Sequence, residues 1–132
     1  MSARREVIAP QQRAPNGAGR AAPPGSPAVR GGDFIFVSGL TAVDLQTGER
    51  VSGTTASETR VILGNLKALL EAAGSSLDRV VKVNVLLHSM LEAPNMNEVY
   101  ARYFPDPPPA RTVWTAQIEA GFKIALDAIA AA

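Results

Sequence analysis

After residue 33, apolar residues recur with two different periods, and each period predicts a different element. From about residue 54 to residue 73 they fall at helical spacing. The members of this stripe are Ile62, Leu66, Leu69, Leu70 and Ala73. Thr54, Thr55 or Ser57 can cap such a helix, and Gly74 can end it. The pattern therefore predicts a helix that packs one face on a sheet or on another helix.

The strand period appears on both sides of this helix. Residues 34–37 form a short apolar run of β-favouring residues, which predicts a buried strand closed by a tight turn at Ser38 and Gly39. Residues 44–49 carry hairpin-turn chemistry, with Gly48 able to take a positive φ. From residue 81 to residue 88, valines and leucines alternate with Lys82, Asn84 and His88, which predicts a strand with one buried face near the centre of the sheet.

A second helix is predicted from Pro94 to about Phe104, because apolar and aromatic residues again follow helical spacing there. The prolines at 105 and 107–109 favour an extended connection, and residues 112–117 and 122–129 are expected to form two last strands. The order β, β, α, β, α, β, β predicts an α+β fold, with both helices on one face of a mixed sheet.

Residues 1–27 have a different composition, rich in proline, glycine and arginine. Proline fixes φ and removes a hydrogen-bond donor, so this segment is expected to be extended or disordered and to join the fold only near Ala28 to Arg30. Residues 28–132 are expected to form one domain. Five arginines against one glutamate make residues 1–32 basic. A solvated tail and an arm for a nucleic acid or an acidic partner both fit that charge.

Composition excludes several classes of function. The chain has 132 residues, 13 basic against 12 acidic side chains, no cysteine and one histidine. Thiolate nucleophiles, disulfides and cysteine or multi-histidine metal sites are therefore impossible, and we expect no metal. A net charge of +1 disfavours a nucleic-acid partner. The sequence lacks both an apolar run of about 18 residues and a secretory signal pattern, which predicts a cytoplasmic protein without a membrane partner.

Arg111 is the strongest candidate for chemistry. It follows a run of prolines and stands at the start of a predicted strand, where a fixed backbone can aim its guanidinium. The planar guanidinium matches a carboxylate through two parallel hydrogen bonds. An ordinary surface arginine, or an ion pair with Glu119 or Asp106, fits the same spacing.

Other candidates each have a structural alternative. Ser38 and Gly39 can present a hydroxyl and an amide to a ligand, or simply form a turn. Asn97 can orient a substrate or bond a loop, and Trp114 can line a pocket or pack. His88 can handle a proton or lie at the surface near a strand end.

Several segments, taken together, resemble the RidA family, also called YjgF/YER057c/UK114. They are FIFVSG at 34–39, TGE at 47–49, NLKALLEAAG at 65–74, Asn97 before Tyr100, PARTV at 109–113 and DAIA at 127–130. The resemblance runs in the right order from about residue 28 to residue 130. The helix that ends in EAAG, combined with PARTV, is its most specific part.

The resemblance implies a chorismate-mutase-like α+β subunit, assembled as a homotrimer around a central barrel, with ligand pockets between subunits. It implies hydrolysis of reactive enamines and imines to 2-keto acids and ammonia, with no cofactor and no metal. Arg111 matches the residue that clamps the substrate carboxylate. Ser38, Gly39 and Asn97 match residues around the pocket, and Trp114 is expected to line it. Val113 matches the position whose backbone carbonyl holds the attacking water.

Two positions depart from the family pattern. The pocket tyrosine of the family falls on Gly25, and the glutamate that contacts the water falls on Ala125. Three hypotheses therefore stay open. The first is an imine deaminase acting on a carboxylate-bearing metabolite, and the second is a homologue that binds a small carboxylate without turnover. The third is the older family label of ribonuclease, which the near-neutral charge and the single histidine oppose.

Overall fold

A computed structural model describes residues 4–8 and 24–132 of the chain. The elements follow in the order β1 (Glu6–Ile8), β2 (Ala28–Gly31), β3 (Phe34–Leu40), α1 (Thr55–Ala72), β4 (Val80–Leu87), α2 (Ala93–Tyr103), β5 (Ala110–Thr115) and β6 (Ile124–Ala131). Short 3₁₀ turns occur at Leu77–Arg79, Met90–Glu92 and Glu119–Gly121. The predicted helices and their flanking strands are present, and the α+β class is confirmed.

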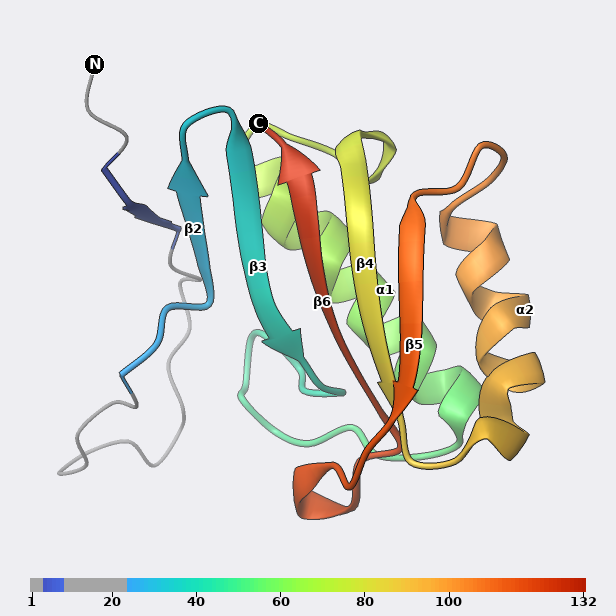
Figure 1. Ribbon diagram of the computed structural model, residues 1–132. Helices are drawn as coiled ribbons and strands as arrows, with labels where there is room; N and C mark the ends of the chain where they lie inside the picture. Colours follow the sequence, from blue (N-terminus) through green and yellow to red (C-terminus); the bar gives the residue numbers. More distant parts are fainter. Residues whose placement is uncertain (1–3, 9–23) are drawn as a thin grey trace, which may run out of the picture.

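The strands form one mixed sheet in the order β1-β2-β3-β6-β4-β5. All pairs are antiparallel except β4 with β5, which are parallel. Figure 1 shows both helices behind the sheet, so among the described residues no helix covers the other sheet face. A parallel pair needs a crossover connection, and α2 supplies it between β4 and β5. The sheet order places β3 and β5 apart, with β6 and β4 between them.

Helix α1 begins and ends as its sequence indicates. The Thr54 hydroxyl oxygen accepts a hydrogen bond from the Ser57 amide at 3.0 Å, which satisfies one free donor of the first turn. Past the other end, Gly74 adopts a φ of +84°, which a glycine takes at little cost. The predicted apolar stripe is buried against the sheet through Ile62, Leu66, Leu69 and Leu70.

The core lies between the helices and the sheet. Its sheet side consists of alternate strand residues, among them Ile35, Val83, Val85, Leu87 and Leu126. Its helix side consists of the α1 stripe together with Met96, Val99, Tyr100 and Phe104 on or beside α2. The helix-free face is also rich in apolar groups: the side chains of Val7, Phe34, Phe36 and Trp114 are 42 to 62% exposed there. Such a face on a single copy is typical of a surface covered by a partner.

Three expectations need correction. Ser38 and Gly39 do not form a turn but continue β3, where the pairing with β6 shifts between Val37 and Leu40. Val81 is 46% exposed and Val80 is buried instead, because the β4 register with β6 shifts at this point. Strand β1 pairs with β2, so the chain joins the fold before Ala28.

The boundary between residues 27 and 28 stays a prediction, as does the extended or disordered state of the segment before it. Residues 1–3 and 9–23 lie outside the described residues.

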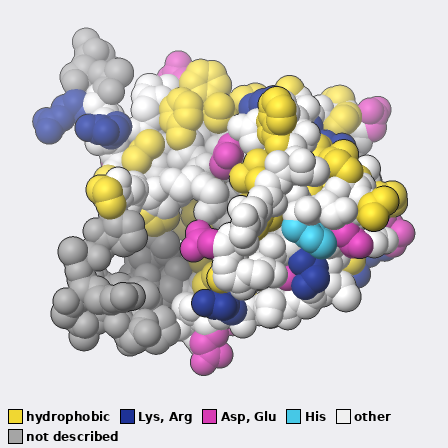
Figure 2. Space-filling model, turned by 60° about the horizontal axis from the view of Figure 1, so that its bottom comes forward, with side chains coloured by type: hydrophobic (Ala, Val, Ile, Leu, Met, Phe, Trp, Pro, Cys, Tyr) yellow, Lys and Arg dark blue, Asp and Glu magenta, His cyan; other side chains and the backbone are white. Residues whose placement is uncertain are grey.

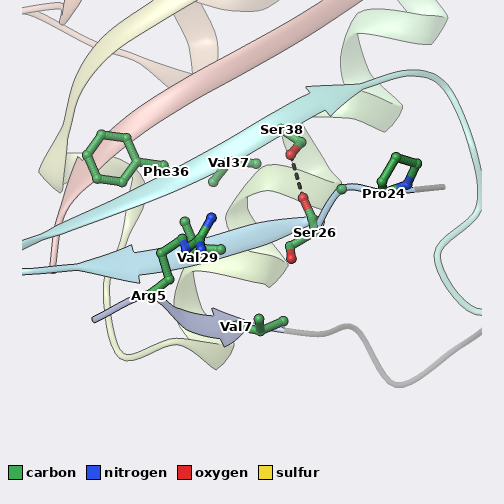
Figure 3. Close-up of a pocket in the computed structure, with 9 residues that line it drawn as sticks. Arg5, Val7, Pro24, Ser26, Val29, Phe36, Val37 and Ser38 are labelled. Atoms are coloured by element: carbon green, nitrogen blue, oxygen red, sulfur yellow. Dashed lines mark hydrogen bonds between the residues drawn. The ribbon is translucent and has the colours of Figure 1, made fainter. Parts of the chain in front are cut away.

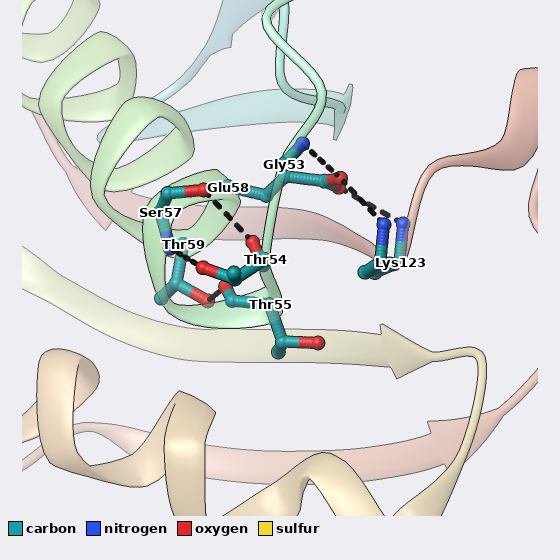
Figure 4. A network of polar contacts seen from close by, with 7 residues as sticks. All are labelled: Gly53, Thr54, Thr55, Ser57, Glu58, Thr59 and Lys123. Carbon is teal, nitrogen blue, oxygen red and sulfur yellow. Dashed lines mark hydrogen bonds and ion pairs between the residues drawn. The ribbon is translucent and has the colours of Figure 1, made fainter.

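A buried carboxylate joins three segments at one end of the sheet. Glu58 is fully buried, and its two oxygens accept from the amides of Lys123 at 2.9 Å and Gly53 at 3.2 Å. The Lys123 ammonium lies 3.8 Å from the same carboxylate. Figure 4 shows these contacts linking the loop before α1, the first turn of α1 and the chain that enters β6. The charge is thereby paired and hydrogen-bonded inside one chain, as a buried charge requires.

Candidate functional site

Arg111 lies at the start of the edge strand β5 and turns toward α2. Its guanidinium donates to the Asn97 side-chain oxygen at 2.7 Å and contacts the Met96 sulfur at 3.7 Å. The guanidinium carbon is 4.7 Å from the centre of the Tyr100 ring, which makes a cation–π contact. Among the described residues these partners are all on α2. Arg111 forms no ion pair there with Glu119 or Asp106, the two acidic residues that the sequence suggested. The arginine is therefore held in place without losing its charge to a carboxylate.

Tyr100 is the main support under Arg111. Its side chain is buried, and its ring lies 4.8 Å from that of Phe104. Burial raises the pKa of the Tyr100 phenol above its ordinary value, and the Arg111 charge offsets part of that rise. The hydroxyl has no hydrogen-bond partner among the described residues. The ring, rather than the hydroxyl, is what positions the guanidinium.

Asn97 therefore acts through Arg111. The sequence leaves two roles for Asn97, orienting a substrate or bonding a loop, and in the structure its carbonyl oxygen accepts one guanidinium N–H of Arg111. The guanidinium has five N–H donors, and its contacts with Asn97 and the Met96 sulfur use two of them, so three remain. That is enough for a two-point hydrogen bond with a carboxylate.

Ser38, Gly39 and Gly25 lie at the opposite side of the sheet. Ser38 is exposed, donates its hydroxyl to the Ser26 carbonyl at 2.5 Å and bonds the Pro27 carbonyl through its amide at 2.9 Å. Ser38 and Gly25 line a pocket of about 660 Å³, which Figure 3 shows on the sheet beside β1, β2 and β3. A Cβ at Gly25 would meet none of the described atoms within 4 Å, so this position has room for a side chain to begin.

The predicted site residues thus form two separate groups in one copy. Arg111 and Asn97 lie on the helix side of β5, and Ser38 lies on the exposed side of β3. Strands β6 and β4 separate β3 from β5. Three interstrand steps of about 4.8 Å each put roughly 14 Å between these strands. A small metabolite cannot contact both groups within one copy.

The remaining strand candidates lie on two faces. On β5, Val113 shares the helix side with Arg111 and packs against the core. Trp114 belongs to the other face by strand alternation and is 62% exposed. Ala125, on β6, pairs with Leu86 of β4 and is buried. Since β5 is an edge strand, some of its backbone groups have no neighbouring strand to bond.

His88 and Glu119 line a second, more open hollow near the end of β4. His88 is exposed, and its amide bonds the Lys123 carbonyl at 3.0 Å. Figure 2 shows the histidine at the surface of this end, with basic and acidic side chains interspersed around it. No single sign of charge dominates the visible face, so it offers no continuous basic path for a nucleic acid.

Two further findings concern metals and membranes. Residues 4–8 and 24–132 contain no group of three or more His, Asp or Glu side chains placed to hold a metal ion. In that same part of the chain, neither helix combines the length and the apolar character needed to cross a bilayer.

Sequence reasoning missed two contributors to these groups. Helical spacing places Tyr100 on the apolar face of α2, and its cation–π contact with Arg111 depends on which strand packs against that face. Arg5, which lines the pocket beside Ser38, comes directly before β1, a strand that the sequence did not predict. Helical spacing carried a signal for Tyr100, whereas a strand of three residues gave almost none for Arg5.

The chain matches the family model described as Endoribonuclease L-PSP over residues 17–132. It is 44% identical over 108 residues to a RutC family protein of Pyrococcus horikoshii, covering 81% of this chain and 86% of that one.

A 2-iminobutanoate/2-iminopropanoate deaminase of Dermatophagoides farinae is 32% identical over 130 residues, 98% of this chain and 97% of its own. Among solved structures, RidA from an Antarctic Psychrobacter aligns with a TM-score of 0.78 at 31% identity, covering 85% of this chain and 91% of that one. The structural overlap shows that the two chains share one fold. The chain belongs to the RidA family, whose model carries the Endoribonuclease L-PSP description.

Proposed function

We propose that this protein hydrolyses reactive imines that carry a carboxylate, giving 2-keto acids and ammonia. The observation that carries the proposal is Arg111, an arginine fixed by Asn97 and Tyr100 that keeps N–H donors for a ligand. A relative of similar length bears the name of such a deaminase. The net reaction adds one water: the carbon–nitrogen double bond breaks, a carbon–oxygen double bond forms, and both water hydrogens leave on ammonia.

Arg111 supplies binding and orientation in this proposal. Its fork holds the substrate carboxylate, and this fixes the neighbouring imine carbon relative to β5. The edge position of β5 leaves backbone carbonyls that can hold the attacking water, and Val113 is our candidate. Orientation of reactants can account for a large part of a rate enhancement when the uncatalysed reaction is already feasible.

The proposed working form is a homotrimer with pockets between subunits. Two features of one copy support an assembly: the apolar side chains on the helix-free face, and the separation of Arg111 from Ser38 by two strands. Placing the Arg111 group of one copy against the Ser38 group of its neighbour would bring a carboxylate clamp and an open pocket together. The site is incomplete without the second copy.

The loss of a glutamate at Ala125 bears on the rate. A general base typically contributes about 10²- to 10⁴-fold. Without one, the proton released by the attacking water must pass to solvent water or to the imine nitrogen. We therefore expect an enzyme whose advantage over the spontaneous reaction is smaller than that of a site with a carboxylate at this position.

The test is the release of ammonia from 2-iminopropanoate or 2-iminobutanoate, generated in situ by an amino-acid oxidase. We expect wild-type protein to accelerate release over buffer, and Arg111→Ala to lower kcat/KM by about 10²- to 10³-fold, because two charge-assisted hydrogen bonds are lost. Arg102→Ala is the matched control, since Arg102 is an exposed arginine on α2 paired with Glu98. No acceleration by the wild type would overturn the proposal.

A second candidate, binding of a small carboxylate without turnover, is favoured by Gly25 and Ala125 alone. It predicts Arg111-dependent binding of 2-oxobutanoate by calorimetry in a protein that gives no acceleration. The same preparation, assayed for RNA cleavage, tests the endoribonuclease label of the family model. Cleavage that survives Arg111→Ala would place that activity outside the proposed site.

A further inference from the structure

The pocket beside Ser38 contains a second arginine that the proposed chemistry does not use. Arg5 lines this pocket together with Val7, Val29 and Phe36 from β1, β2 and β3, and with Gly25, Ser26 and Ser38 at its polar side. Figure 3 shows the Arg5 side chain extending from the chain just before β1 toward β2, beside Val29. The pocket therefore combines an apolar floor with one positive charge.

The strand pairing explains the apolar floor of the pocket that Arg5 lines. Val7 pairs with Val29, and Val29 pairs with Phe36, so these three side chains form one row across the helix-free face. Arg5 comes directly before β1, and it lines the same pocket as Val7 of that strand. Glu6 belongs to the other face, where its carboxylate lies 3.9 Å from Arg30.

Arg5 also keeps its charge available. Among the described residues, no carboxylate lies within ion-pair distance of its guanidinium, and the nearest acidic neighbour in sequence, Glu6, pairs with Arg30. An unpaired guanidinium beside apolar side chains attracts a carboxylate more strongly than one in open water. The size of the pocket, about 660 Å³, suits a ligand larger than the smallest imino acids.

We propose that Arg5 binds a second carboxylate on the substrate side chain, so that the preferred substrates are imines of dicarboxylic amino acids. This inference rests on the proposed function, in which Arg111 of one copy holds the carboxylate next to the imine. The pocket of the neighbouring copy then receives the side chain. Val7, Val29 and Phe36 contact its methylene groups, and Arg5 pairs with its terminal carboxylate.

The experiment compares two substrates with carbon chains of equal length, 2-iminoglutarate and 2-iminopentanoate, generated from L-glutamate and L-norvaline by suitable amino-acid oxidases. They differ only in a terminal carboxylate or methyl group. We expect Arg5→Ala to lower kcat/KM for 2-iminoglutarate by about 10- to 100-fold and to leave 2-iminopentanoate within about twofold. Arg5→Lys should restore part of the loss, because it keeps the charge without the fork.

Arg4→Ala is the matched control. This substitution removes the same charge from the adjacent position, and Arg4 is not among the described residues that line the pocket. Equal kcat/KM losses for both substrates in Arg5→Ala, or no loss for either, would overturn the inference while leaving the deaminase intact.

If wild-type protein accelerates neither reaction, the proposed function fails, and calorimetry then decides the inference. Tighter binding of 2-oxoglutarate than of 2-oxopentanoate, abolished by Arg5→Ala, supports it, and equal binding refutes it.

Discussion

The surroundings of Glu58 and the candidate site differ in how their charged side chains are paired. Glu58 is fully buried, and amide donors from two other segments and the ammonium of Lys123 meet its carboxylate within the same chain. Arg111 and Arg5 lie at opposite edges of the sheet, and neither is paired with a carboxylate among the described residues. The first charge is satisfied within one copy, whereas the two arginines have no acidic partner among the described residues of that copy.

This difference separates residues that stabilise the fold from residues that we propose bind a ligand. A buried charge without partners is costly, so a fold retains one only where its hydrogen bonds are satisfied, as at Glu58. A cation near the surface keeps its water and can remain unpaired until an anion arrives. Partners inside the chain therefore predict an effect on stability, whereas an unpaired charge beside a pocket predicts an effect on binding.

Assembly gives the largest expected effect. Phe34 is 42% exposed on the helix-free face and does not line the pocket beside Ser38. We expect Phe34→Asp to place a charge in the subunit contact, to yield monomers by analytical ultracentrifugation and to reduce imine hydrolysis to the buffer rate, while circular dichroism stays that of the folded chain.

Leu91→Asp is the control for this change. Leu91 is 87% exposed, yet it lies in the turn before α2 and away from the sheet face. It should leave both mass and turnover unchanged. A Phe34→Asp monomer that retains full turnover would mean that one copy holds a complete site, and the comparison drawn above would fail.

Removal of the Glu58 carboxylate tests the other side of the comparison. Glu58→Ala leaves the amides of Gly53 and Lys123 without their acceptor. We therefore expect the free energy of unfolding, measured by urea denaturation, to fall by about 3 kcal/mol. Glu71→Ala, on the exposed side of the same helix, should cost less than about 0.5 kcal/mol. Equal effects of the two changes would show that the network carries no stability.

Much of the fold was predictable because the sequence within each element indicates its type and its ends. The α1 stripe, its Thr54 cap and Gly74 follow from spacing and side-chain chemistry within one element. The shifts at Ser38 and Val81 were not predictable, because each depends on the register with β6, which is distant in sequence. Strand β1 has three residues and gains its stability from pairing with β2 rather than from its own pattern.

The candidate site was predictable only in part, for a related reason. Arg111 stands out in the sequence since prolines fix the chain ahead of it. Its partners do not, because Asn97 and Tyr100 are selected by how α2 packs on β5. The separation of Arg111 from Ser38 follows from the sheet order alone, in which β6 returns between β3 and β4. No local pattern encodes that order.

Changes at Tyr100 give the smallest expected effects. They separate the role of its ring, which supports Arg111, from that of its buried hydroxyl. Tyr100→Phe keeps the ring under Arg111 and removes a hydroxyl that has no partner among the described residues, so kcat/KM should stay within about twofold and stability should rise by up to about 1 kcal/mol. Tyr100→Leu removes the ring, and we expect KM to rise about 3- to 10-fold with little change in kcat.

Alkaline unfolding provides the independent readout for the hydroxyl. Because burial raises the Tyr100 pKa above 10.0, the unfolded chain loses this proton first. The folded state is therefore favoured below about pH 10 and loses that advantage as the pH rises through the folded pKa. Wild-type protein should lose stability over this window relative to Tyr100→Phe, and Tyr103→Phe, on the same helix, should not reproduce the difference. Identical alkaline profiles for wild type and Tyr100→Phe would place the phenol in contact with water, and Arg111 would then rest on a support less rigid than a buried ring.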